Sequence, residues 1–194
     1  MSKTTIISEL RHAMRNHSLI SLCGDSDSFD DAAMGYILAI TPSSLLFQRV
    51  LVSGLDGGYE VWRLTDVHHV ACEGRFEQCQ QTLHENRDEL YREAEPPELE
   101  GENLHGALLR QAMENKLFVD VIPEDPAESL QGFVLDLGND FVKIQIVDSY
   151  GEEDAQAIIS LDSVRSVHYN SPSNQRREFL HRKQANNTGR EGGQ

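Results

Sequence analysis

Apolar positions in the first half of the chain follow a helical period and then a strand period. Ile6, Leu10, Ala13 and Met14 recur at helical spacing, which predicts a short amphipathic helix over residues 6–16. Short apolar or alternating runs then predict five strands, over residues 19–22, 34–40, 45–53, 59–64 and 69–72. Polar and glycine-containing segments separate these runs, as expected for turns.

The second half shows the same order of patterns. A helix is predicted over residues 104–115, followed by strands over 117–122, 132–137, 141–148, 155–161 and 166–169. Between the halves, Phe76, Cys79, Leu83, Leu90 and Tyr91 stand at helical spacing in a polar segment. They predict a connecting helix over about residues 75–94, ended by the two prolines at 96 and 97.

Three segments recur with nearly constant spacing, which indicates a tandem duplication. LRHAMRN at 10–16 recurs as LRQAMEN at 109–115, GYILAI at 35–40 as GFVLDL at 132–137, and LTDVHHV at 64–70 as LDSVRSV at 161–167. We therefore expect one domain at 1–74, a helical acidic linker at 75–101, a second domain at 102–172 and a polar, locally basic flexible tail at 173–194.

Composition is that of an ordinary globular chain, with 39% hydrophobic and 25% charged residues. No apolar run approaches the roughly 18 residues of a membrane span, and residues 1–9 lack the apolar core of a secretory signal. We expect a cytoplasmic protein without a membrane partner. Cys23, Cys72 and Cys79 all lie in the first half, which is typical of free thiols rather than of a repeated disulfide framework.

The formal net charge of −15 disfavours nucleic acids, whose affinity depends on Lys and Arg neutralising phosphates. DNA is not expected as a partner, and RNA is disfavoured without being excluded. Acidic residues concentrate over 73–102, and cations gather over 176–190. A solvated linker and a frayed tail are the plainest interpretation of these charges.

Two segments of the second half carry a resemblance to a known family. GFVLDLGNDFVKIQIVD at 132–148 and ISLDSVRSV at 159–167 resemble the first and second motifs of the Sm-like (LSm) proteins, known also from bacteria. Residues 35–52 and 62–70 match the same motifs more loosely. The resemblance implies a mainly β chain with two tandem small open barrels of the SH3-like or Sm-like kind, each with an N-terminal helix, joined by a connecting helix.

The resemblance also implies where a ligand would bind. Sm-like proteins that bind RNA usually carry Arg-Gly or Lys-His between strands four and five, whereas this chain has RLTD at 63–66 and SLDS at 160–163. Asn139 and Asp140 could bond a base edge and Phe141 could stack on it, or they form an Asx-type turn and a core residue. The candidate binding residues are Ser43, Ser44, Arg63, His68, Asn139, Asp140 and Phe141.

Other candidate sites fail on spacing. Asp25, Asp27, Asp30 and Asp31 do not match a calcium-binding loop, because the glycine and the final glutamate are missing. Five residues of the types that ligate zinc lack the usual close cysteine pair; they are His68, His69, Cys72, Cys79 and His84. No nucleophile motif, phosphate loop or dinucleotide fingerprint is present, so we expect no enzyme, no metal and no cofactor. Trp62 is expected to share a buried strand face with Leu64 rather than to form an exposed hot spot.

The sequence thus favours a non-enzymatic Sm-like binding or assembly protein that forms homo-oligomers through barrel edges. One alternative is RNA binding in the Sm manner. A second alternative is a small-ligand sensor with a pocket between the barrels. Comparison of the two halves indicates a shared scaffold and no shared candidate site.

Overall fold

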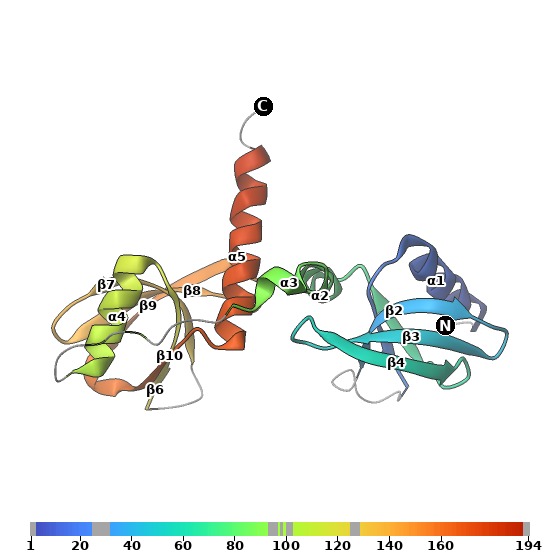
Figure 1. Cartoon of the computed structure of the whole chain (residues 1–194), viewed down its shortest axis with the longest axis horizontal. Coiled ribbons are helices and arrows are strands. Elements are labelled where there is room, and N and C mark those ends of the chain that lie inside the picture. Colours follow the sequence, from blue (N-terminus) through green and yellow to red (C-terminus); the bar gives the residue numbers. More distant parts are fainter. Residues whose placement is uncertain are drawn as a thin grey trace. The chain divides into compact units, whose positions relative to one another are not determined.

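The computed structural model describes residues 3–24, 32–92, 97, 99, 103–124 and 129–191. The chain divides into two compact units, Met1–Arg87 (unit 1) and Asp88–Gln194 (unit 2), each coloured by sequence in Figure 1. In the described residues, ten strands form two five-stranded antiparallel sheets. The predicted mainly β character is confirmed. The aspartates of the 24–33 loop and five glutamates of the acidic stretch 73–102 fall outside the described residues; the latter are Glu93, Glu95, Glu98, Glu100 and Glu102.

Unit 1 consists of a helix, five strands and a second helix. Their bounds are α1 Lys3–Asn16, β1 Ile20–Cys23, β2 Ala33–Ile40, β3 Ser44–Val50, β4 Asp56–Arg63, β5 His69–Cys72 and α2 Arg75–Glu85. The sheet order is β4-β3-β2-β1-β5. A short helix, α3 (Arg87–Leu90), follows at the boundary between the units.

Unit 2 repeats this plan. Its elements are α4 Leu104–Asn115, β6 Phe118–Pro123, β7 Leu130–Leu137, β8 Phe141–Val147, β9 Glu153–Ser160, the short 3₁₀ turn η1 Leu161–Ser163, β10 Val164–Tyr169 and α5 Pro172–Glu191. The sheet order, β10-β6-β7-β8-β9, is the unit 1 order read with equivalent strands. The duplication therefore covers topology as well as sequence segments.

Each sheet bends at the same place, beside an early glycine. A Cβ added to Gly35 would lie closer than 3.0 Å to the carbonyl oxygen of Gln48, and one at Gly132 equally close to that of Gln145. A bulge follows in both copies, between Ile37 and Ala39 in unit 1 and between Val134 and Asp136 in unit 2. The glycine lets the neighbouring strand come close, and the bulge adds local twist.

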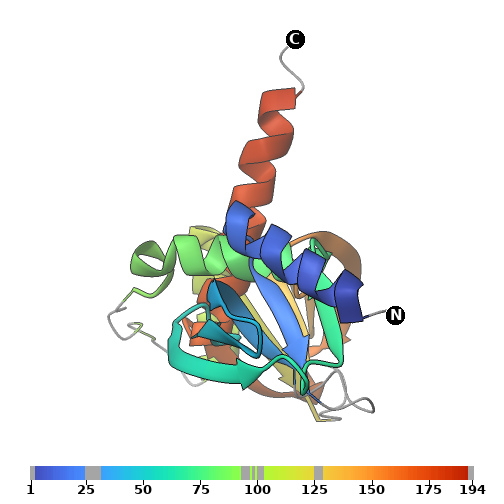
Figure 2. The same ribbon diagram turned by 90° about the vertical axis from the view of Figure 1, so that its right-hand side faces the viewer.

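Each unit has its own apolar core under its first helix. In unit 1, Leu10 and Ala13 of α1 are buried with Leu22 and Phe47 of the sheet, and Figure 2 shows α1 in dark blue against that sheet. In unit 2, α4 buries Leu109 and Ala112 in the same way among the residues of its own sheet. Trp62 and Leu64 both pack against the first core, which confirms their predicted common face.

The expected linker helix and tail are corrected by the structure, because each is the closing helix of a unit. α2 belongs to unit 1, where Nδ1 of His84 donates a hydrogen bond to the carbonyl oxygen of Gly54 at 2.9 Å. The segment predicted as a flexible tail is α5, where Nδ1 of His181 donates to the carbonyl of Gly151 at 3.0 Å. The two compact units meet between Arg87 and Asp88, so each contains a helix after its five strands, and the repeat runs helix, five strands, helix.

The buried faces of α2 and α5 contain polar residues that form hydrogen bonds. α2 buries Glu77, which accepts a 2.7 Å hydrogen bond from Oγ of Ser21. α5 buries Gln175, whose amide bonds the backbone of Arg92. Such pairs stabilise buried polar positions that an apolar pattern does not mark, so the pattern predicted a helix at α2 without its place in unit 1, and it left α5 unpredicted. No helix of the described residues is long and apolar enough to cross a membrane.

Candidate functional site

The turns singled out by the Sm-like resemblance come together in both units. In unit 1, the backbone N–H of Leu64 donates to the carbonyl oxygen of Ser43 at 3.0 Å, and Ser44 lies opposite Arg63 in the β3–β4 pairing. In unit 2, the N–H of Leu161 donates to the carbonyl of Asp140 at 2.9 Å. The connection after the fourth strand therefore lies against the turn between the second and third strands.

The polar groups of these turns are largely used within the turns. In unit 1, Oγ1 of Thr41 accepts from the N–H groups of Ser43 and Ser44, at 3.4 and 3.0 Å. In unit 2, the counterpart of Arg63 is Ser160, whose Oγ accepts from the N–H of Asp162 at 3.3 Å and begins η1. These contacts are those of well-formed turns. Among the seven candidate binding residues, Arg63 is the one with a permanently charged cationic side chain.

Asn139 and Asp140 are exposed at the tip of the β7–β8 turn, whereas Phe141 is half-buried. A Cβ added to Gly138 would fall closer than 3.0 Å to carbons of the Phe141 ring, so this ring covers the backbone of Gly138. One face of the ring is therefore already occupied. This placement favours the packing interpretation of Phe141 over base stacking.

His68 is exposed in the connection before β5, and its backbone N–H donates to the carbonyl oxygen of Cys23 at 3.0 Å. His69 and Cys72 belong to β5, whereas Cys79 and His84 belong to α2. Within the described part of the chain, no three His, Cys, Asp or Glu residues lie close enough to hold a metal ion. The sequence cluster is therefore not a spatial cluster.

The edge strands β4 and β9 expose apolar side chains at equivalent positions. The exposed fraction is 73% for Val61 of β4 and 65% for Ile158 of β9. Both residues lie on the outward face of a strand at the end of its sheet. An edge strand with exposed β-branched residues offers free backbone groups together with apolar surface, the features that allow strand addition.

The inner face of β4 is anchored by a charged network. Oε1 of Glu60 accepts from Nη1 of Arg49 at 2.9 Å, and Oε2 accepts from the indole N–H of Trp62 at 2.8 Å. Burial raises the pKa of Glu60, but the hydrogen bonds from Arg49 and Trp62 outweigh it and hold the pKa below its ordinary value. The network keeps Glu60, Trp62 and Arg49 inward, so Val61 faces outward.

The two edges of the unit 2 sheet carry opposite charges. β9 begins with the exposed acids Glu153 and Asp154, whereas β10, at the other end of the sheet, exposes Arg165 and His168. β9 and β10 occupy the two ends of the strand order. Their charges are complementary between sheets of two molecules.

Tyr36 of β2 is buried beneath the closing helix of unit 1. His17 stacks on its ring with centroids 4.6 Å apart and planes inclined by 11°. Burial, reinforced by the carboxylate of Glu85 and opposed by Arg87, raises the pKa of Tyr36 to about 12. The counterpart in unit 2 is Phe133, which has no ionisable group.

We expect the stability of unit 1 to fall between pH 10 and pH 12 because of Tyr36. The unfolded chain loses the phenol proton near pH 10 and the folded chain near pH 12, so the folded state holds the proton more tightly. The contribution, roughly 2 to 3 kcal/mol, is complete below pH 10 and is lost by pH 12. Urea unfolding across this range should show a steeper loss for the native chain than for Tyr36→Phe. Parallel losses would contradict the prediction.

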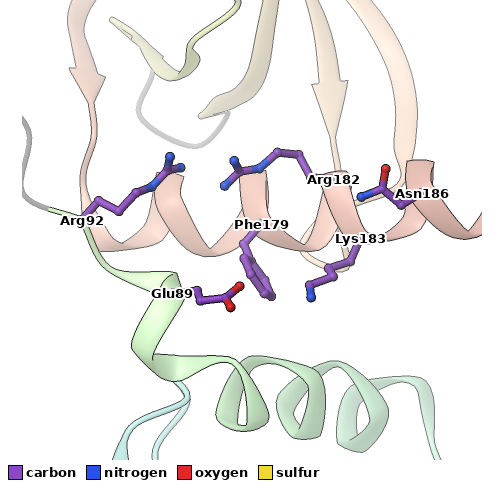
Figure 3. A pocket seen from close by; sticks show the side chains of 6 residues that line it. All are labelled: Glu89, Arg92, Phe179, Arg182, Lys183 and Asn186. Carbon is purple, nitrogen blue, oxygen red and sulfur yellow. The ribbon is translucent and has the colours of Figure 1, made fainter.

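A cationic pocket of about 300 Å³ lies between the segment around α3 and α5. Figure 3 shows the guanidinium groups of Arg92 and Arg182 lying toward one another on one side of α5. Oε1 of Glu178 lies 3.7 Å from Nη2 of Arg92 and 3.7 Å from Nε of Arg182. Glu89 contributes a second carboxylate to the lining, so the positive charge is largely balanced.

Gln175 fixes the backbone that carries this pocket. Its Oε1 accepts from the N–H of Arg92 at 2.7 Å, and its Nε2 donates to the carbonyl oxygen of Arg92 at 2.9 Å. The basic segment assigned to a tail is thus part of a built surface. The network of Arg92, Glu178 and Arg182 joins the ends of unit 2.

Two features of the site were missed at the sequence level. Gln175 and Arg92 stand far apart in the chain, and no pattern links them. The pair His84 and His181 did leave a signal, because it keeps the spacing of 97 seen in the other recurring segments, as do Gly54 and Gly151. The two halves therefore share a structural histidine that bonds the turn before the fourth strand. Comparisons with protein-family models, with curated proteins and with solved structures found no match to this chain.

Proposed function

We propose that this protein is a non-enzymatic assembly module of the Sm-like type, which associates with further copies of itself by pairing edge strands. The observation that carries the proposal is the equivalent exposure of Val61 on β4 and Ile158 on β9. The sheet order, with the fourth and fifth strands at the two ends and a helix before the first strand, is compatible with this type. Pairing would extend each sheet and place both side chains beside those of the added strand.

A second copy is the occupant that the charges favour. The acidic edge at β9, with Glu153 and Asp154, matches the edge at β10, with Arg165 and His168. Pairing β9 of one copy with β10 of another brings opposite charges together, whereas pairing two β9 strands brings like charges together. A head-to-tail contact of this kind generates a ring or a chain of copies.

The double variant Val61→Lys and Ile158→Lys tests the proposal. Lysine on an edge strand opposes strand addition, because pairing would bury its charge. We expect the native chain to sediment as an oligomer and the variant to dissociate at least about tenfold more readily, which corresponds to about 1.4 kcal/mol. Sedimentation equilibrium over a hundredfold range of protein concentration measures both.

Leu104→Lys is the matched control, because Leu104 is 56% exposed and lies on helix α4 rather than on an edge strand. It should leave the association unchanged. A native chain that stays monomeric at every concentration would reject self-association. Equal effects of the edge variant and the control would reject the edges as its site.

A further inference from the structure

Unit 2 holds an open pocket of about 470 Å³, lined by residues of α4, β7, β8 and β9 and by His181 of its closing helix α5. Phe133 and Leu135 supply apolar surface, while Lys116, Gln145, Glu153 and His181 supply polar groups. Pockets that bind small molecules generally measure about 300 to 1,000 Å³ and combine apolar surface with a few polar groups. The pocket lies within one unit, and the repeat supplies a second version of it for comparison.

Unit 1 fills the equivalent place with its own side chains. The ring of His17, the counterpart of Lys116, stacks on Tyr36, the counterpart of Phe133, at 4.6 Å. His17 and Lys116 both occupy the left-handed position after the first helix, with φ of 50° and 52°. The Tyr36 ring of unit 1 is therefore covered by the planar imidazole of His17.

The carboxylate of Asp56 in unit 1 likewise has partners within its own unit. Asp56, the counterpart of Glu153, accepts from Nε2 of Gln48 at 3.0 Å. Nε of Arg87 lies 3.6 Å from its other oxygen, and Nε2 of His84 lies 3.7 Å from the first. A guanidinium and an imidazole thus surround this carboxylate.

Unit 2 lacks both of these internal partners. Lys116 has no ring that could stack on Phe133. The Phe133 ring contacts Phe118 edge-on, with planes inclined by 83°, and His181, with planes inclined by 48°. Gln184 stands at the position of Arg87, and its Nε2 donates to the carbonyl oxygen of Tyr150 at 2.8 Å. Among the described residues, no hydrogen bond or ion pair to the Glu153 carboxylate is found.

We propose that this pocket binds a small molecule that carries a planar ring and a cationic nitrogen. The ring stacks on Phe133 as His17 stacks on Tyr36, and the cation pairs with Glu153 as Arg87 pairs with Asp56. His181, held by the carbonyl oxygen of Gly151, forms a fixed wall beside Phe133. The ligand thereby supplies the two groups that unit 1 supplies from its own chain.

Phenethylamine is the simplest probe, because it carries one ring and one ammonium group. Isothermal titration should show saturable binding at one site per chain. The neutral 2-phenylethanol and the ring-free hexylamine should each bind at least about tenfold more weakly, since each lacks one of the two groups. Glu153→Gln should weaken phenethylamine at least about tenfold, whereas Asp154→Asn, at the neighbouring exposed acid, should leave it unchanged.

Exchanging the internal partners between the units gives the sharpest test. Lys116→His with Gln184→Arg should close the pocket of unit 2 and abolish binding. His17→Lys with Arg87→Gln should open the equivalent place in unit 1 and raise the stoichiometry from one site to two. Circular dichroism checks that the variants fold. If the unit 1 exchange does not fold, the loss of phenethylamine binding in the unit 2 exchange tests the assigned site by itself.

Absence of saturable phenethylamine binding to the native chain would overturn the proposal. Undiminished binding by Glu153→Gln, or by the exchanged unit 2, would overturn the assigned site. A folded unit 1 exchange that gains no second site would overturn the comparison between the units. Because Glu153 and Asp154 also lie on the β9 edge, the titrations are repeated with the Val61→Lys, Ile158→Lys chain. Binding that is equal in both chains separates the pocket from the association, and binding that is lost with the edge variant would overturn a pocket within one chain.

Discussion

Gly132→Ala is expected to unfold unit 2 while unit 1 stays folded. The added methyl group would lie closer than 3.0 Å to the carbonyl oxygen of Gln145, a backbone atom of the paired strand β8. Backbone in the middle of a sheet cannot move away without losing ladder hydrogen bonds. We expect a loss of about 4 kcal/mol or more, a size seen when a substitution creates severe overlap.

Gly58→Ala is a suitable control for Gly132→Ala. Gly58 also lies in a strand, has a φ of +89°, and would present its Cβ to open space. The backbone conformation alone should then cost about 1 to 2 kcal/mol. Urea unfolding followed by far-ultraviolet circular dichroism separates the two values, and equal losses would contradict the assigned close approach at Gly132.

Phe47→Ala should have the second largest effect, and it should act on unit 1. Phe47 lies at the centre of the first core, packed with Leu10, Leu22 and Leu45, and its side chain is fully buried. Removing such a ring leaves a cavity that the surrounding core cannot fill, at about 3 to 5 kcal/mol. Phe76→Ala, at the same residue type but 39% exposed on α2, should cost under about 1 kcal/mol.

The single tryptophan separates the two units in these measurements. Trp62 belongs to unit 1 and packs against its core, so its fluorescence follows that unit. Phe47→Ala should shift the fluorescence transition to lower urea, and Gly132→Ala should leave it in place. A fluorescence shift with Gly132→Ala as large as that with Phe47→Ala would show that the two units unfold together.

Much of the secondary structure could be predicted from periodicity and turn residues. Two predicted elements match the structure in both of their bounds. They are the helix over 104–115, which follows the N-cap Asn103, and the strand over 69–72. The turn at 54–58 was placed too late, since the chain turns over residues 51–55 and Gly57 and Gly58 enter β4. A bulge after Arg49 absorbs the extra residue, and such an irregularity leaves no periodic signal.

The roles of the closing helices α2 and α5 could not be predicted from apolar periodicity. Their buried faces contain Glu77 and His84 in α2 and Asn174 and Gln175 in α5. Periodicity predicts that each of these residues is exposed to solvent. A partner elsewhere in the chain accounts for the burial of Glu77, His84 and Gln175, whereas Asn174 bonds Ser171 three residues before it. Extending the spacing of 97 beyond residue 70 would have matched His84 with His181 and identified both helices as repeated elements.

The candidate site was predictable in part. The resemblance singled out the turns that carry Ser43 and Asp140, and the structure places each against the connection after the fourth strand. The sequence could not indicate which strands form the sheet edges, nor that Val61 and Ile158 face outward there, because a strand pattern defines two faces without naming the covered one. The pocket of unit 2 depended on contacts of His17 and Arg87 that only coordinates reveal.

Amide hydrogen exchange at low and high protein concentration tests edge pairing most directly. The free N–H groups of an edge strand exchange with water unless another strand covers them. We predict that the amides of β4 and β9 around Val61 and Ile158, and those of the opposite edges β5 and β10, gain protection as concentration rises, while α1 and α4 do not change. Protection that is independent of concentration at all four edge strands, or that rises on the helices instead, would contradict assembly through the sheet edges.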